Sequence, residues 1–79
     1  MELYQLRQFA AVAKYENMTR AAESLNVAQP AVSKTIRNLE SELGAELFER
    51  TGKGLRRTEQ GDILLRYART ILELSLIHI

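Results

Sequence analysis

The sequence predicts a mainly α fold in which three helices precede a two-strand hairpin and one further helix. Two observations predict it. Apolar residues recur at the spacing of amphipathic helices in four segments of the chain. Between the third and fourth segments, residues 47–57 hold two short runs around Thr51-Gly52-Lys53-Gly54, which is typical of a hairpin turn. The 79 residues suffice for one small domain.

Two short helices are expected first, over residues 3–15 and 20–25. The first has an apolar face formed by Leu3, Leu6, Phe9, Ala10 and Ala13. Asn17 and Thr19 both offer a capping oxygen, and we expect Thr19 to begin the second helix. Asn26 tolerates the left-handed conformation that ends a helix, and Val27 is then expected to fill the core below the turn.

The third helix has the clearest pattern in the chain. A single buried stripe is predicted from four apolar residues spaced by four, three and four, namely Val32, Ile36, Leu39 and Leu43. Pro30 suits the first turn, because proline lacks the N–H group that would be unpaired there. Gly44 is expected to end this helix.

The hairpin is predicted from strands at residues 47–50 and 55–57. Thr58 then caps the last helix, in which the acidic Glu59 lies near the positive end of the helix dipole. The apolar face of this helix is broader than one small domain needs, and it consists of Leu64, Leu65, Ala68, Ile71 and Leu72. We therefore expect dimerisation with the same helix of a second copy.

Together these elements predict a winged helix-turn-helix over residues 1–58 and the start of a linker or dimerisation helix over residues 59–73. The last six residues, LSLIHI at positions 74–79, match the translation of a transposon-end sequencing adapter. We expect them to be a non-native tail. The alternative is the last turn of an amphipathic helix.

Composition excludes several classes of protein. The chain is 46% hydrophobic and 27% charged, as in ordinary globular domains. Cysteine is absent, which excludes disulfides and thiolate metal sites and fits a reducing cytoplasm. No apolar run approaches the roughly 20 residues that span a bilayer. No nucleophile–base pair is present, so neither catalysis nor a metal site is expected. A solvated acidic rim is predicted from Glu40, Glu42, Glu46 and Glu49.

The exposed part of the third helix keeps a positive potential, although the net charge is only +1. No acidic residue occurs between Glu23 and Glu40. A firmly held helix with polar side chains facing outward can enter the major groove of DNA. The side chains predicted to meet DNA bases or phosphates are Gln29, Pro30, Ser33, Lys34 and Arg37.

The hairpin carries four cations in eight residues with no acid among them, namely Arg50, Lys53, Arg56 and Arg57. Such a loop can follow phosphates or insert a cation into a narrow minor groove. The alternative is an exposed hairpin that charge keeps from aggregating. Beside the third helix we favour DNA, and we add Thr19 and Arg20 as candidate phosphate anchors.

The order of the motifs resembles the amino-terminal domain of the LysR-type transcriptional regulators of bacteria. The likeness runs over residues 3–61 and rests on AAESL, QPAVS, NLESELGAELFER and the Thr-Glu-x-Gly entry into the last helix. Two positions depart from the family pattern. Ala28 replaces a common serine or threonine, which removes a helix cap worth about 1 kcal/mol. Arg57 replaces a frequent apolar residue and adds positive charge.

The resemblance implies a sequence-specific transcription factor that binds double-stranded promoter DNA as a homodimer, in the cytoplasm and in association with the nucleoid. It also implies a longer parent protein in which a separate effector domain binds a small-molecule co-inducer, and for which a tetramer stays open. No cofactor is expected in this fragment. Two alternatives remain: a winged-helix protein-interaction module without DNA binding, and an interfacial membrane helix over residues 64–79. The second is disfavoured by Asp62 and Glu73.

Overall fold

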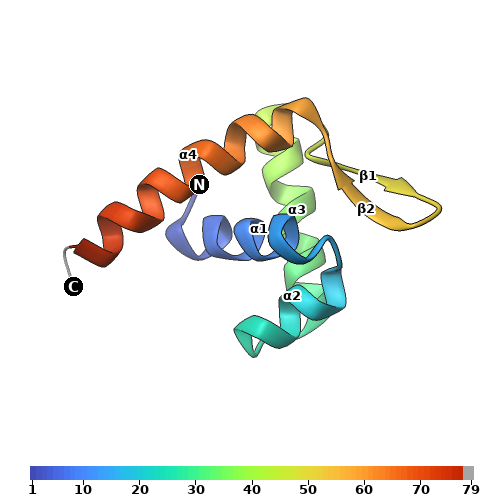
Figure 1. Ribbon diagram of the computed structural model, residues 1–79, viewed down its shortest axis with the longest axis horizontal. Helices are drawn as coiled ribbons and strands as arrows, with labels where there is room; N and C mark the ends of the chain where they lie inside the picture. Colours follow the sequence, from blue (N-terminus) through green and yellow to red (C-terminus); the bar gives the residue numbers. More distant parts are fainter. Residues whose placement is uncertain (78–79) are drawn as a thin grey trace.

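The computed structural model describes the backbone of residues 1–77 and the side chains of residues 1–74. Its elements in chain order are α1 (Leu3–Tyr15), α2 (Met18–Leu25), α3 (Gln29–Leu43), β1 (Phe48–Thr51), β2 (Gly54–Arg57) and α4 (Glu59–Ile77). In Figure 1, α1 runs below α4, α2 lies at the far side of α1, and the hairpin projects from one end. This arrangement confirms the predicted winged helix-turn-helix. Of the expected tail, only Leu74 lies within the described side chains.

The helix ends follow the sequence signals with one exception. Asn26 and Gly44 adopt the predicted left-handed conformation, with φ of 57° and 66°. At the start of α2, however, the Oδ1 atom of Asn17 accepts the backbone N–H of Arg20 at 2.9 Å. Asn17 is therefore the cap, and the expectation that Thr19 begins this helix is wrong. Thr19 lies within the first turn of α2 and is already part of the helix.

The core is built around α1, which packs against α2, α3 and α4. Its largest fully buried side chains are Phe9, Val12, Val32, Leu39 and Leu47. Two apolar residues expected inside are not. Val27 is 38% exposed, because the turn uses its backbone N–H, which donates to the Ala22 carbonyl at 3.0 Å, and not its side chain. Leu43 is 43% exposed, since it ends α3 beyond the residues that pack on this helix.

Each strand of the hairpin reaches one residue further toward the turn than predicted. Its strands pair antiparallel with Phe48 opposite Arg57 and Thr51 opposite Gly54, so that Gly52 and Lys53 alone form the turn. Leu47 precedes the first strand, and its N–H donates to the Glu40 carboxylate at 2.8 Å. Glu40 thus fixes the entry to the hairpin, and its assignment to a solvated acidic rim is wrong.

The entry into α4 explains the Thr-Glu-x-Gly motif. The Oγ1 atom of Thr58 accepts the N–H of Gly61 at 3.1 Å, which confirms the predicted cap. Gly61 is buried, and a Cβ atom there would lie 2.2 Å from the carbonyl oxygen of Leu47. The first turn of α4 can therefore cross this backbone only where the side chain is hydrogen.

Candidate nucleic-acid interface

Helix α3 presents its polar face on a rigid support. Val32, Ile36 and Leu39 are buried beneath it, as predicted. On the outer side, Pro30, Lys34 and Arg37 are exposed, whereas Gln29 and Ser33 are half-buried. The five predicted reading residues therefore share the outward side of one helix.

Two of these residues are bonded to each other. The Nε2 atom of Gln29 donates to the hydroxyl oxygen of Ser33 at 2.7 Å. This contact orients the Gln29 amide, and it leaves the hydroxyl hydrogen of Ser33 available to an acceptor on DNA. An amide that is oriented before binding loses less side-chain entropy when it meets a base.

Adjoining grooves separate the hairpin from the helices. The largest of them lies between the hairpin and the α1–α2 turn, and Arg20, Lys53 and Arg56 border it. Two smaller grooves continue toward α3, and Arg50 borders both. On the helix side these two are bordered by Thr19, Gln29, Ser33 and Arg37. Candidate residues from α2, α3 and the hairpin therefore meet on one side of the molecule.

The four hairpin cations are not equivalent. Arg50 pairs with Leu55 across the strands, and residues at both positions line the grooves toward α3. Lys53 lies in the turn, and Arg56 lies on β2 directly opposite Glu49. These two face solvent. Arg50, Lys53 and Arg56 thus remain candidates for phosphate contacts.

Arg57 has a different place from the one its predicted role requires. Its Nη1 atom donates to the carbonyl oxygen of Ala13 at 2.8 Å, and its Nε atom donates to Oδ1 of Asp62 at 2.7 Å. The guanidinium is committed to the body of the protein, so the assignment of Arg57 to a DNA-facing cation is corrected. Sequence reasoning missed this role, although an arginine at a usually apolar strand position is a signal that it has a polar partner.

Helix α4 divides its apolar residues between two faces. Leu64, Leu65 and Ala68 are buried in the core of this chain and therefore stabilise a single copy. Of the predicted dimerisation residues, Ile71 is exposed and Leu72 half-buried. The outward apolar stripe, which sequence reasoning only partly found, comprises Ile63, Tyr67, Ile71 and Leu74. Its signal was the spacing of four residues from position 63 onward.

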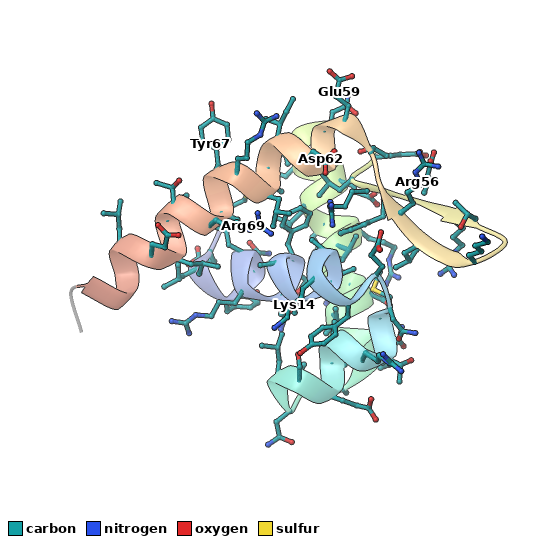
Figure 2. All side chains as sticks on the ribbon, in the orientation of Figure 1. Lys14, Arg56, Glu59, Asp62, Tyr67 and Arg69 are labelled. Carbon is teal, nitrogen blue, oxygen red and sulfur yellow. The ribbon has the colours of Figure 1, made fainter. Side chains whose placement is uncertain are left out.

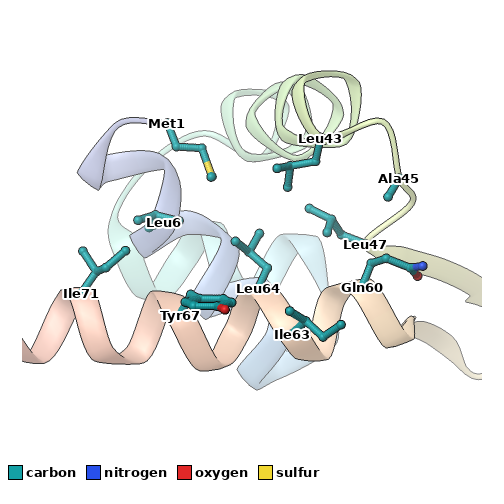
Figure 3. Close-up of a pocket in the computed structure, with 10 residues that line it drawn as sticks. All are labelled: Met1, Leu6, Leu43, Ala45, Leu47, Gln60, Ile63, Leu64, Tyr67 and Ile71. Atoms are coloured by element: carbon teal, nitrogen blue, oxygen red, sulfur yellow. The ribbon is translucent and has the colours of Figure 1, made fainter.

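The exposed stripe borders an apolar groove. Helix α4 forms one wall of it, and the first residues of the chain and the end of α3 form the other (Figure 3). Leu43 lies in this groove, which accounts for its exposure at the end of α3. Tyr67, which is 66% exposed, projects outward from α4 (Figure 2). An apolar surface of this kind suits protein–protein contact.

Within the described part of the chain, no three histidine, cysteine, aspartate or glutamate side chains are placed to hold a metal ion. Among the described residues, no helix combines the length and the apolar character that crossing a membrane requires.

The sequence of this chain matches the model of a known protein family over most of its length. The model described as bacterial regulatory helix-turn-helix protein, lysR family, matches residues 3–62. The chain belongs to this family. The RuBisCO operon transcriptional regulator of Allochromatium vinosum is 51% identical over 71 residues, which make up 90% of this chain and 24% of that protein. The regulator PcaQ of Agrobacterium fabrum is 51% identical over 63 residues, or 80% of this chain and 20% of PcaQ.

Solved structures agree with this assignment. The structure of the CbnR_DBD–DNA complex matches with a TM-score of 0.89 and 44% identity, covering 95% of this chain and 86% of that one. The BenM_DBD complex with catB site 1 DNA matches with a TM-score of 0.90 and 41% identity, covering 95% and 84%. The chain spans about a quarter or less of the two curated regulators named above. The chain has the winged helix-turn-helix fold of the LysR family, and the two relatives named above are transcriptional regulators, not enzymes.

Proposed function

We propose that this LysR-family domain binds promoter DNA sequence-specifically as a homodimer, with α3 in the major groove and the hairpin along the adjacent backbone. The observation that carries the proposal is the convergence of side chains from three elements. Arg20 of α2, Arg50 of β1 and the polar side of α3 border adjoining grooves on one side of the molecule. The similarity to the CbnR and BenM complexes with DNA supports DNA as the ligand.

The base contacts are assigned to the first half of α3. Gln29 can make a bidentate contact to adenine, and Lys34 can donate to O6 and N7 of guanine. Ser33, which Gln29 holds by a hydrogen bond, reaches a base edge or a phosphate. Pro30 makes the apolar contact at the tip of the helix, and Arg37 lies one turn further on, where a phosphate is the expected partner.

The phosphate contacts surround this helix. Arg50, Lys53 and Arg56 supply charge from the hairpin, and Thr19 and Arg20 supply polar groups from the first turn of α2. Contacts to phosphate fix the register of the protein on the duplex and make binding dependent on salt, but they carry no sequence information of their own.

Dimerisation is assigned to the exposed stripe of α4. Two copies that pair their Ile63, Tyr67 and Ile71 side chains about a two-fold axis would cover the apolar surface that one copy leaves exposed. Two recognition helices then address inverted half-sites about 34 Å apart, or a multiple of it. The parent regulator would act in the cytoplasm on the nucleoid, would assemble as a dimer or tetramer, and would bind its co-inducer in a separate effector domain.

The test is a selection of duplexes from a random-sequence pool by the 79-residue chain at modest salt. Enrichment of an inverted repeat is the expected result, since it requires both base reading and pairing of two copies. Enrichment of a single half-site would contradict pairing through α4 and keep base reading. No enrichment by a sample that circular dichroism shows to be folded would contradict DNA reading and favour a protein-interaction module.

A further inference from the structure

Arg57 joins three elements that are far apart in sequence. It is the last residue of β2, and its guanidinium contacts the carboxyl end of α1 through Ala13 and the first turn of α4 through Asp62. The two bonds use different nitrogen atoms, so both form at once. No point charge on a flexible stem reproduces this fork geometry.

Both contacts are made at helix ends, and the one with Ala13 satisfies a carbonyl that α1 leaves unpaired. Ala13 is among the last four residues of α1, whose carbonyls have no partner further along the helix. A cation is favourable at that negative helix end, and an acid such as Asp62 is favourable at the positive end of α4. At the base of the hairpin, the charges of Arg57 and Asp62 are therefore favourable to the dipoles of the two helix ends.

The hairpin needs these contacts because little else directs it. A two-strand sheet is marginal by itself in water. The first strand is anchored at its base by Phe48, whose ring lies 5.4 Å from that of Phe9, and by the Glu40 carboxylate. At the base of the second strand, the polar anchor is Arg57.

We propose that Arg57 is a positioning residue, which sets the direction of the hairpin relative to α3 and thereby the affinity for DNA without contacting a phosphate. The inference rests on the proposed function of α3 and the hairpin. The positive charge at this position then holds the hairpin in place, and its charged partner is Asp62 and not a phosphate.

Removing Asp62 distinguishes this role from direct contact. If Arg57 bound phosphate, the loss of a neighbouring acid would free the guanidinium and strengthen binding to DNA. If Arg57 positions the hairpin, Asp62→Ala weakens binding about fivefold to tenfold although it removes a negative charge. Glu59→Ala is the matched control, because Glu59 is an exposed acid in the same first turn of α4.

Arg57→Lys gives a second comparison with the charge held constant. Lysine keeps the cation and is a good point-charge partner for phosphate, but it lacks the fork. We expect about fivefold to tenfold weaker binding with an unchanged slope of log affinity against log salt. Arg7→Lys, at an exposed position of α1 that has no assigned part in DNA binding, serves as control and is expected to bind like the wild type.

The measurement is fluorescence anisotropy of a labelled duplex from the selection, over a salt series and below the unfolding transition of every variant. Wild-type binding with weakened Asp62→Ala and Arg57→Lys, and with both controls unchanged, is the expected outcome. Equal or tighter binding by Asp62→Ala, or wild-type affinity of Arg57→Lys, would overturn the role of Arg57 alone. Failure of the folded wild type to bind would overturn the proposed function and, with it, this inference.

Discussion

Helix α3 and the hairpin meet the same side of the molecule but are held by different forces. Val32 and Leu39 under α3 are fully buried, so the helix is fixed by apolar packing along its length. The hairpin is anchored mainly where it joins the body, by Phe48, by the bond that Glu40 accepts from Leu47 and by the bond that Arg57 donates to Ala13, with half-buried Leu55 as a further apolar contact. Beyond that base, residues 49–54 are exposed. Buried apolar area therefore holds α3, whereas a small number of contacts near its base hold the hairpin.

This difference suits the two tasks that we assign to them. Reading a base edge requires donors placed within a few tenths of an ångström, which a packed helix provides. Following a phosphate backbone tolerates more movement, because Coulomb attraction is not strongly directional. Close packing along α3 holds its side chains in place, whereas the hairpin depends for its direction on a few contacts at its base.

The largest effect is expected where apolar packing is removed. Leu39→Ala should lower the free energy of unfolding by about 4 kcal/mol, because it leaves a cavity at a fully buried position. Leu55→Ala, which truncates a half-buried leucine of the hairpin, should cost only about 1 kcal/mol. Urea denaturation followed by circular dichroism measures both. Equal losses would show that the hairpin is as tightly packed as α3.

The next largest loss of stability is expected where α4 crosses the backbone of Leu47. Gly61→Ala should destabilise the fold by about 3 kcal/mol, because its Cβ would meet the Leu47 carbonyl oxygen and force the two backbones apart. The matched control is Gly52→Ala in the hairpin turn, where an added Cβ meets no described atom within 4 Å. A stable Gly61→Ala protein would mean that α4 can shift away from the hairpin at little cost.

The sequence predicted what periodicity and capping control, and little of what depends on distant partners. The bounds of α1 and the left-handed ends at Asn26 and Gly44 follow from local signals. Spacing also located the apolar face of α4, but it could not say which residues pack inside one copy. The partner of Glu40 lies across a loop, and one of the two partners of Arg57, the Ala13 carbonyl, lies 44 residues away, so local patterns do not identify these contacts.

The difference between α3 and the hairpin is also expected in DNA binding, where one lysine of each can be tested. Lys34→Ala on α3 should weaken binding to the selected duplex by about 1–3 kcal/mol and relax preference at one base pair. Lys53→Ala in the hairpin turn should weaken all sequences alike and lower the salt slope by about one unit. Anisotropy titrations against the selected duplex and single-base variants of it separate the two results. Unchanged preference in Lys34→Ala would refute the assigned reading face.

The smallest expected effect concerns the start of α2, which carries the candidate phosphate anchors. Asn17→Ala should lower the free energy of unfolding by about 1 kcal/mol, because its Oδ1 caps the N–H of Arg20. Thr19→Ala, two residues on and exposed, should cost less than about 0.5 kcal/mol in stability. If Thr19 meets a phosphate, however, the same substitution weakens DNA binding, so that stability and affinity respond to different residues of one turn. Thermal unfolding and anisotropy on both variants test this separation, and a Thr19→Ala protein with unaltered affinity would leave α2 as a support for α3 alone.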